Sequence, residues 1–402
     1  MYRLRSTRTI VVALAVMTAV ARPVPAQGID PPPDTSHQLG PLAIAPVFRL
    51  ADVGRDSNVY NESENPRSDT TATASPSIGV WLRSPALRLA GSGQVAFVYF
   101  RRLTELRAVD RAFTARAEIP LRWLMPYFSG TETVTRDGRN FEIDTPVRRV
   151  GRSVEAGADV RLTGKVTVGA GARRSRQEYS GDALLNLSES LNRTTEVQTV
   201  RFRYAVTPLT SLGVVSERQL DKFTSATGSD PLSYRVMPEV EFQPLALVRG
   251  RAQVGFRSRT YADLRTPDYR GLAARVDLQY TLLGSTSFTV GFQRDLEDSY
   301  LSQADYVLGG GRVSVRHRLS DPWEVGASVS RYRLNYRSPV GTVDPSSLYP
   351  AERVVSVGAE VGYRMGRSGL GFQVDYTKRD VGASILREYE RLRLISSVTH
   401  DF

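Results

Sequence analysis

Arginine is the residue type that offers this sequence the most chemistry. In the segment 249–259, Arg249, Arg251, Arg257 and Arg259 are separated by even numbers of residues, so in an extended chain they project to one side. The same spacing recurs elsewhere, and the arginines that fall on polar faces are Arg161, Arg201, Arg203, Arg249, Arg251, Arg257, Arg259, Arg275, Arg312, Arg316, Arg364, Arg379 and Arg393. Two interpretations remain open. The set either lines a water-filled space and attracts anions or acidic saccharides, or fills that space by pairing with nearby carboxylates.

Other residue types give little support for catalysis. Histidine occurs only as His37, His317 and His400, and the last two fall on the apolar faces of their segments. The carboxylates on polar faces have arginines close by, so mutual neutralisation explains them more simply than acid–base catalysis. The sequence has no cysteine, which excludes thiol catalysis, disulfides and thiolate metal sites. We therefore expect no enzyme activity, no cofactor and no metal site.

Two short motifs could be mistaken for ligand sites. Residues 309–311 are three consecutive glycines, but no helix pattern follows them, so we expect a crowded bend in a strand and not a phosphate loop. Residues 56–58, Asp-Ser-Asn, offer too few oxygen ligands for calcium, and a solvated turn is the simpler expectation.

Alternation of apolar and polar residues defines the elements that carry the arginines. Residues 153–162 place Val154, Ala156 and Val160 on one face and Glu155 and Asp159 on the other. The segments 249–259, 272–281, 355–365 and 370–379 repeat this pattern. Such strands fit a sheet with one apolar face and one wet face.

The connections indicate how the strands are joined. Short links at 163–165, 207–210, 244–247, 282–285, 320–323 and 366–368 alternate with long polar segments at 55–69, 137–147, 180–192, 224–232 and 338–352. Short periplasmic turns that alternate with long extracellular loops are typical of a bacterial outer-membrane barrel. The alternating runs predict about 18 strands, and 16 remains possible because residues 42–125 are less regular. A β-propeller is disfavoured because each repeat of about 40 residues holds two long strands instead of four short ones.

Aromatic residues predict the two membrane interfaces. The expected short-turn belt contains Trp123, Tyr204, Tyr280, Trp323, Tyr363 and Phe402, and the expected long-loop belt contains Tyr234, Tyr300 and Tyr376. The two interfaces of a bilayer favour aromatic residues, so a membrane barrel has an aromatic belt on each side of its apolar band.

The two ends of the chain carry their own signals. Arg3, Arg5 and Arg8 precede an apolar run over 10–21 that is shorter than a bilayer span, so residues 1–26 are predicted to be a signal peptide. Residues 27–41 contain three consecutive prolines and are predicted to form a periplasmic linker before a barrel over 42–402. The last segment places Leu392, Leu394, Val398 and Phe402 on one face, which resembles the C-terminal assembly signal of outer-membrane proteins.

Composition agrees with this interpretation. A mean hydropathy of −0.27 with 24% charged residues would ordinarily indicate a soluble protein. This inference does not apply to a membrane barrel, because only every second strand residue contacts lipid. The formal net charge is +11, but the arginines are interleaved with acidic residues and do not form one patch, so we expect no nucleic-acid partner.

The start of the predicted barrel resembles a known family. Residues 40–48, Gly-Pro-Leu-Ala-Ile-Ala-Pro-Val-Phe, followed by 56–60, Asp-Ser-Asn-Val-Tyr, resemble a β-barrel porin family of EpsL-like outer-membrane proteins, often found with exopolysaccharide export and exosortase systems. Residues 269–272 and 332–336, together with Tyr300, are similar in style. The resemblance implies a barrel with a role in polysaccharide export, and it carries no catalytic residues.

Together these observations predict a single all-β domain, a transmembrane antiparallel up-and-down β-barrel in the bacterial outer membrane. Its expected function is that of a passive channel, or of the barrel component of exopolysaccharide export, with a mildly anion-favouring lumen. The alternatives are a plugged structural or adhesive barrel and, less favoured, an outer-membrane enzyme. The expected partners are outer-membrane lipid, the barrel-assembly machinery, and anionic solutes or polysaccharide.

Overall fold

The computed structural model describes residues 35, 37–136, 140–180, 187–225, 230–243, 246–263, 266–300, 305–337, 351–381 and 387–402. The predicted signal peptide, most of the predicted linker and most of the predicted loop 338–352 lie outside these residues. In the described part of the chain, no helix has the length and apolar character needed to cross a bilayer.

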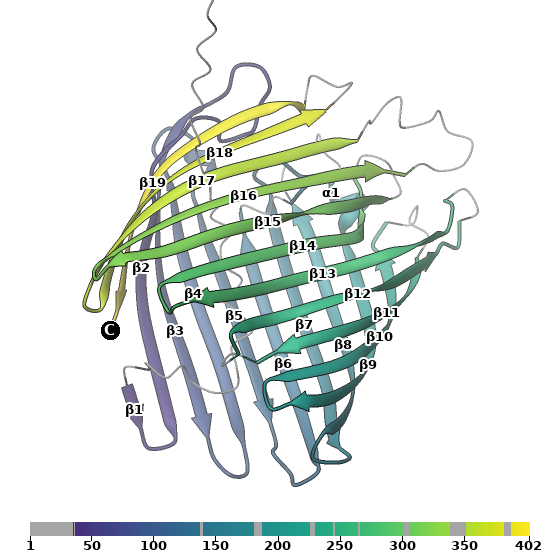
Figure 1. Cartoon of the computed structure of the whole chain (residues 1–402). Helices are drawn as coiled ribbons and strands as arrows, with labels where there is room; N and C mark the ends of the chain where they lie inside the picture. Colours follow the sequence, from purple (N-terminus) through teal and green to yellow (C-terminus); the bar gives the residue numbers. More distant parts are fainter. Residues whose placement is uncertain are drawn as a thin grey trace, which may run out of the picture.

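Eighteen antiparallel strands, β2 to β19, form a closed ring (Figure 1). Each strand pairs with its neighbours in sequence, and β19 closes the ring against β2. The predicted up-and-down barrel is confirmed, with 18 strands and not 16. The strands are β2 (Leu42–Asp56), β3 (Asp69–Arg83), β4 (Arg88–Phe100), β5 (Ala108–Glu118), β6 (Leu124–Thr135), β7 (Arg148–Arg161), β8 (Val166–Ser180), β9 (Arg193–Thr207), β10 (Thr210–Phe223), β11 (Leu232–Phe242), β12 (Val248–Thr260), β13 (Tyr269–Leu282), β14 (Thr286–Asp298), β15 (Asp305–Ser320), β16 (Trp323–Tyr336), β17 (Glu352–Met365), β18 (Ser368–Val381) and β19 (Tyr389–Asp401).

Three short elements lie outside this ring. Strand β1 (His37–Leu39) pairs with the start of β2, with His37 opposite Ile44. Residues 37–39 belong to the predicted linker, and they pair through backbone atoms with the start of β2, which β19 does not reach. A 3-10 turn, η1 (Thr104–Leu106), joins β4 to β5, and a five-residue helix, α1 (Leu187–Leu191), precedes β9.

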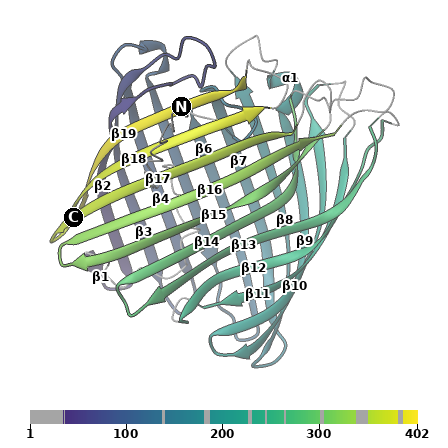
Figure 2. The ribbon, with the colours of Figure 1, turned by 45° about the horizontal axis from the view of Figure 1, so that its top comes forward.

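The connections separate the two ends of the barrel. Tight turns join β7 to β8, β9 to β10, β13 to β14, β15 to β16 and β17 to β18 at one end, as predicted. The described parts of the longer connections, such as 140–147, lie at the other end, where α1 also lies, and the C-terminus lies at the short-turn end (Figures 1 and 2). We call these the short-turn end and the long-loop end.

The strands keep an apolar outer face and a polar inner face. Large outward side chains such as Phe256, Phe372 and Val154 are exposed, while their sequence neighbours project into the lumen. Trp123, Tyr204, Trp323 and Phe402 are exposed near the short-turn end, and Tyr234 near the long-loop end.

One predicted belt residue does not belong to the outer face. Tyr300 lies after β14 and packs against the buried cluster of Ile143 and Tyr179. Its expected place in the long-loop belt is therefore wrong. The residue follows the end of its strand, where the two-residue alternation no longer determines direction.

Close approach of neighbouring strands explains the glycine run, which lies within β15 as predicted. A Cβ placed on Gly310 would lie 2.2 Å from the carbonyl oxygen of Arg331 on β16. A side chain at this position would therefore push the two strands apart.

The last strand closes the barrel. Arg393 pairs with Asp56 on β2, and the backbone N–H of Phe402 donates to the carbonyl of Pro46 at 3.2 Å. Leu392, Leu394, Val398 and Phe402 are all exposed on the outer face. Their role as an assembly signal remains a prediction.

Candidate functional site

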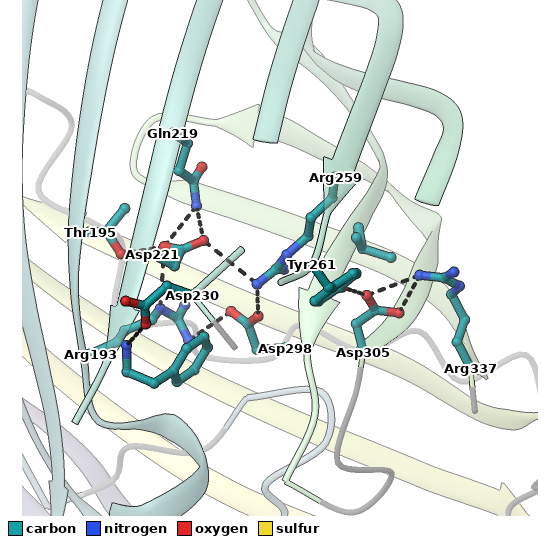
Figure 3. Close-up of polar contacts among 12 residues, drawn as sticks. Arg193, Thr195, Gln219, Asp221, Asp230, Arg259, Tyr261, Asp298, Asp305 and Arg337 are labelled. Atoms are coloured by element: carbon teal, nitrogen blue, oxygen red, sulfur yellow. Dashed lines mark hydrogen bonds and ion pairs between the residues drawn. The ribbon is translucent and has the colours of Figure 1, made fainter. Parts of the chain in front are cut away.

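The long-loop end of the lumen is crossed by a buried polar cluster, which we call the mouth network: Arg193, Asp221, Arg259 and Asp298. Asp298 lies 2.7 Å from Nη1 of Arg193 and 2.5 Å from Nη2 of Arg259, and the same Nη2 lies 3.6 Å from Asp221 (Figure 3). Arg259 and Asp221 are almost completely buried. Because buried charges are stable only when paired, the network holds four strands together.

The mouth network shows that β14 leans into the lumen. Arg193 begins β9 and Asp298 ends β14, so the two lie five strands apart around the ring and still touch. Pairing between β13 and β14 also ends at Ala274 and Arg294, although β14 continues for four more residues.

Two arginines fill the gap left between β13 and the end of β14. Arg235 and Arg257 reach Asp295 of β14 at 2.7 and 2.8 Å, and Arg257 also donates to the carbonyl of Leu296. Side-chain contacts therefore replace the missing backbone ladder at this point of the wall.

A second acidic centre lies beside the mouth network. Asp305, at the start of β15, accepts hydrogen bonds from Arg337 at 3.0 Å and from the hydroxyl of Tyr261 (Figure 3). Behind it, Tyr306, Leu308 and Leu334 form a buried apolar cluster. This end of the barrel thus has a packed interior.

The segment between β6 and β7 crosses the lumen. Its described residues 140–147, which we call the latch, start from strands that lie half-way round the ring from β16. Phe141 nevertheless packs on Tyr332 of β16, with ring centroids 4.3 Å apart. Tyr332 faces inward four residues before the end of its strand, so the latch lies inside the barrel and not above it.

Polar contacts fix the latch to the opposite wall. Asp144 lies 3.5 Å from Arg379 of β18 and 3.6 Å from Arg387, and its carbonyl accepts from Asn61 at 2.6 Å. Arg379 and Arg387 both pair with the buried Glu352. The latch is therefore anchored by ion pairs that it shares with β17 and β18.

Glu142 is the titratable group at the centre of the latch. Its side chain is fully buried and accepts hydrogen bonds from the Ser299 hydroxyl at 2.5 Å and from the Tyr300 N–H at 3.0 Å. Burial raises the pKa of Glu142 to about 7, although these hydrogen bonds and the charge of Arg387 act in the opposite direction. The carboxyl can therefore change charge near neutral pH.

The predicted arginines fall into two groups. Eight form ion pairs with carboxylates: Arg203, Arg251, Arg257, Arg259, Arg275, Arg316, Arg379 and Arg393. Within the described residues, the other five have no carboxylate partner: Arg161, Arg201, Arg249, Arg312 and Arg364. All five lie in the middle or the short-turn half of their strands. The arginines of the mouth network are thus paired, whereas these five arginines form no ion pair with a described carboxylate.

Sequence reasoning missed two sets of residues. The latch was assigned to a long polar extracellular loop, although Phe141 and Ile143 are apolar residues that such a loop does not need. Several outward-facing arginines, among them Arg152, Arg174 and Arg176, were also overlooked. The sequence could have revealed them, because the residues on one face of a strand, taken at every second position, change from apolar residues to arginines.

The comparisons with known proteins agree with this architecture. Residues 131–402 match the family model described as "Putative beta-barrel porin 2". The chain belongs to this family. It is a porin-like channel of the outer membrane. A search of the curated proteins returns no match.

A solved porin structure has the same fold at low identity. The OccK2 (OpdF) structure from Pseudomonas aeruginosa, in complex with glucuronate, has a TM-score of 0.52 and 10% identity, and the match covers 89% of this chain and 98% of that one. A BenF-like porin from Pseudomonas fluorescens Pf-5 has a TM-score of 0.49 and 13% identity, with coverage of 90% and 100%.

Proposed function

We propose that the barrel is a channel that favours small anionic solutes, including acidic saccharides. The observation that carries this proposal is the set of five lumen arginines without a carboxylate partner among the described residues, such as Arg201 and Arg312. Fixed positive charge along a water-filled path raises the local concentration of anions and lowers that of cations. The five arginines lie on β7, β9, β12, β15 and β17, so the effect acts along the larger part of the ring.

The latch limits the size of the solute. Phe141 and Glu142 reach the opposite wall, so a solute that enters from outside must pass beside the latch or displace it. A small acidic sugar suits such a path, and glucuronate, the ligand in the OccK2 structure, is a convenient probe of that chemistry.

We also propose a second role, as the barrel component of exopolysaccharide export. It rests on the resemblance of residues 40–48 and 56–60 to EpsL-like proteins. A polymer would require the latch to leave the lumen, so this role needs an opening step that a passive channel for small solutes does not. A plugged structural barrel is the alternative in which no opening occurs.

Ion selectivity tests the channel proposal. Purified protein in planar bilayers under a salt gradient should give a reversal potential of anion-selective sign, and the selectivity should weaken as salt screens the charge. The variant R201Q/R249Q/R312Q should move the permeability ratio towards unity, because it removes three unpaired lumen charges. Glucuronate should permeate the variant more slowly than the wild type, or should block its current less.

A matched control has the same change in charge outside the lumen. The variant R152Q/R174Q/R176Q removes three outward-facing arginines and should keep the wild-type selectivity. Cation selectivity in the wild type, or an equal loss in both variants, would contradict the proposal. Absence of any conductance would favour the plugged barrel.

We further propose that export to the outer membrane removes residues 1–26 and that the barrel-assembly machinery recognises the last strand. The basic and apolar character of the N-terminus supports the first step. The exposed stripe that ends at Phe402 supports the second. Mass spectrometry of the protein isolated from membranes tests the cleavage, which should leave Gln27 as the first residue.

A further inference from the structure

The outer face of β7 and β8 changes from apolar to cationic part-way along the strands. Val154 is exposed on the outer face and pairs with Arg174, and Arg152 pairs with Arg176 in the same register. Because cross-strand partners share a face, all three arginines point away from the lumen. Ala170 and Ala172 continue the same register of β8 towards the short-turn end.

The depth of these arginines agrees with a membrane interface. The apolar outward positions of β7 run from Val154 to the exposed Leu162, which corresponds to about 21 Å along the barrel axis for a strand tilted by about 40°. The apolar band of an outer-membrane barrel is about 25 Å tall. Arg152, Arg174 and Arg176 therefore lie at the edge of the band on the long-loop side, which is the outer leaflet.

A hollow on the outer surface leads to these arginines. It has a volume of about 1030 Å³ and crosses the wall from β3 to β9. Small residues form its floor, among them Gly91, Ala115 and Gly130, and Val154 lies beside them, while the Phe113 ring lies over Gly93. A surface with glycine and alanine in place of larger side chains is recessed, so it can receive a flexible apolar chain.

The charges at the end of the hollow are only partly neutralised. Glu132 lies 3.2 Å from Arg111 and 3.1 Å from Arg152, and Arg176 pairs with Glu178 at 2.6 Å. For Arg174, no hydrogen bond or ion pair joins it to any residue that the structure describes. Each guanidinium has five N–H donors, so one carboxylate leaves most of them free for a further acceptor.

We propose that this groove binds a phosphate-bearing lipid of the outer leaflet. The acyl chain lies along the Gly91, Ala115 and Gly130 floor, and the phosphate accepts hydrogen bonds from Arg152, Arg174 and Arg176. Phosphate suits this cluster because planar guanidinium groups bind its oxygens in pairs, at a depth where water competes less than in bulk. A second copy of the chain is a poorer occupant, since a two-fold contact would set arginines against arginines. The proposal concerns the outside of the wall and is independent of what the lumen conducts.

Native mass spectrometry of the full-length protein tests the proposal. Folded protein in detergent is mixed with diphosphorylated lipid A, its dephosphorylated form, or diacylglycerol, which has no phosphate. The diphosphorylated lipid should remain bound under collisional activation that removes the other two. The variant R152Q/R174Q/R176Q should lower the bound fraction at least tenfold.

The opposite side of the barrel provides a matched control. The variant R331Q/R333Q/R353Q removes three outward arginines of β16 and β17 and should bind as the wild type does. Ala115→Phe fills the groove without a change in charge and should also weaken binding, which keeps the test decisive if the triple variant folds poorly. A heat-modifiable gel shift reports folding for each variant.

Three outcomes would overturn the proposal. Equal losses in both arginine triples would show a general charge effect. If the dephosphorylated lipid stays bound as strongly as the phosphorylated one, the arginines do not recognise the phosphate. If the wild type forms dimers without bound lipid and the R152Q/R174Q/R176Q variant is monomeric, the occupant is a second copy of the chain.

Discussion

Protonation of Glu142 should strengthen the contact between the latch and the opposite wall. Burial raises the pKa of this carboxyl from 4.5 to about 7. The shift of about 2.5 units corresponds to roughly 3 kcal/mol, or about 300-fold in an equilibrium constant. Because the docked-state pKa is the raised one, this stabilisation is complete below about pH 4.5 and is lost as the pH rises through 7. The docked latch should therefore be favoured in acid.

The variant Glu142→Gln isolates this effect. Glutamine has nearly the same shape and cannot ionise, and its amide oxygen can accept from the Tyr300 N–H while its amide nitrogen donates to the Ser299 hydroxyl oxygen. In planar bilayers, the wild type should spend more time in a low-conductance state at pH 5 than at pH 8, with a midpoint near 7. The Glu142→Gln channel should stay in the low-conductance state over the whole range.

A control carboxylate lies in another loop. Glu105 accepts a hydrogen bond from Tyr60, and this bond helps to lower its pKa. Glu105→Gln should therefore leave the midpoint near 7 unchanged. The reasoning would be refuted if wild-type gating did not depend on pH between 5 and 8, or if the Glu142→Gln channel kept the wild-type dependence.

Three other predictions address assembly, orientation and the mouth network. Deletion of Phe402 should lower the folded, outer-membrane fraction in a heat-modifiable gel shift, and an unchanged yield would remove its assembly role. The chain has no native cysteine, so single introduced cysteines report the orientation of the barrel without background. Glu64→Cys in the β2–β3 loop should react with an impermeant thiol reagent in intact cells, and Gly164→Cys in a tight turn should not. The reverse pattern would show that the barrel has the opposite orientation. Arg259→Gln removes one of the two buried arginines that pair with Asp298 and leaves Arg193 to compensate both Asp221 and Asp298, so it should reduce the free energy of unfolding by up to about 3–5 kcal/mol in urea titrations; the double variant R259Q/D298N should recover part of the loss, and equal stabilities would show that the network is not coupled.

Much of the fold could be predicted from local rules. A strand has a period of two residues, so Val154, Glu155 and Ala156 already distinguish the lipid face from the lumen face. Turn length then separates the two ends of the barrel, and the count of alternating runs gave 18 strands. Arg251 and Arg257 were assigned to the inner face for the same reason, and the structure places both beside inward carboxylates.

The sequence by itself determined the barrel and the two faces of its wall, because alternation, turn length and aromatic position are properties of neighbouring residues. Only the tertiary structure decided which arginines are neutralised, that β14 leans inward, and that the latch crosses to β16. Those features depend on contacts such as Arg193 with Asp298 and Phe141 with Tyr332, which join residues more than 100 positions apart. No local sequence pattern predicts these long-range contacts. They depend on how the ring closes and on which buried charges are paired.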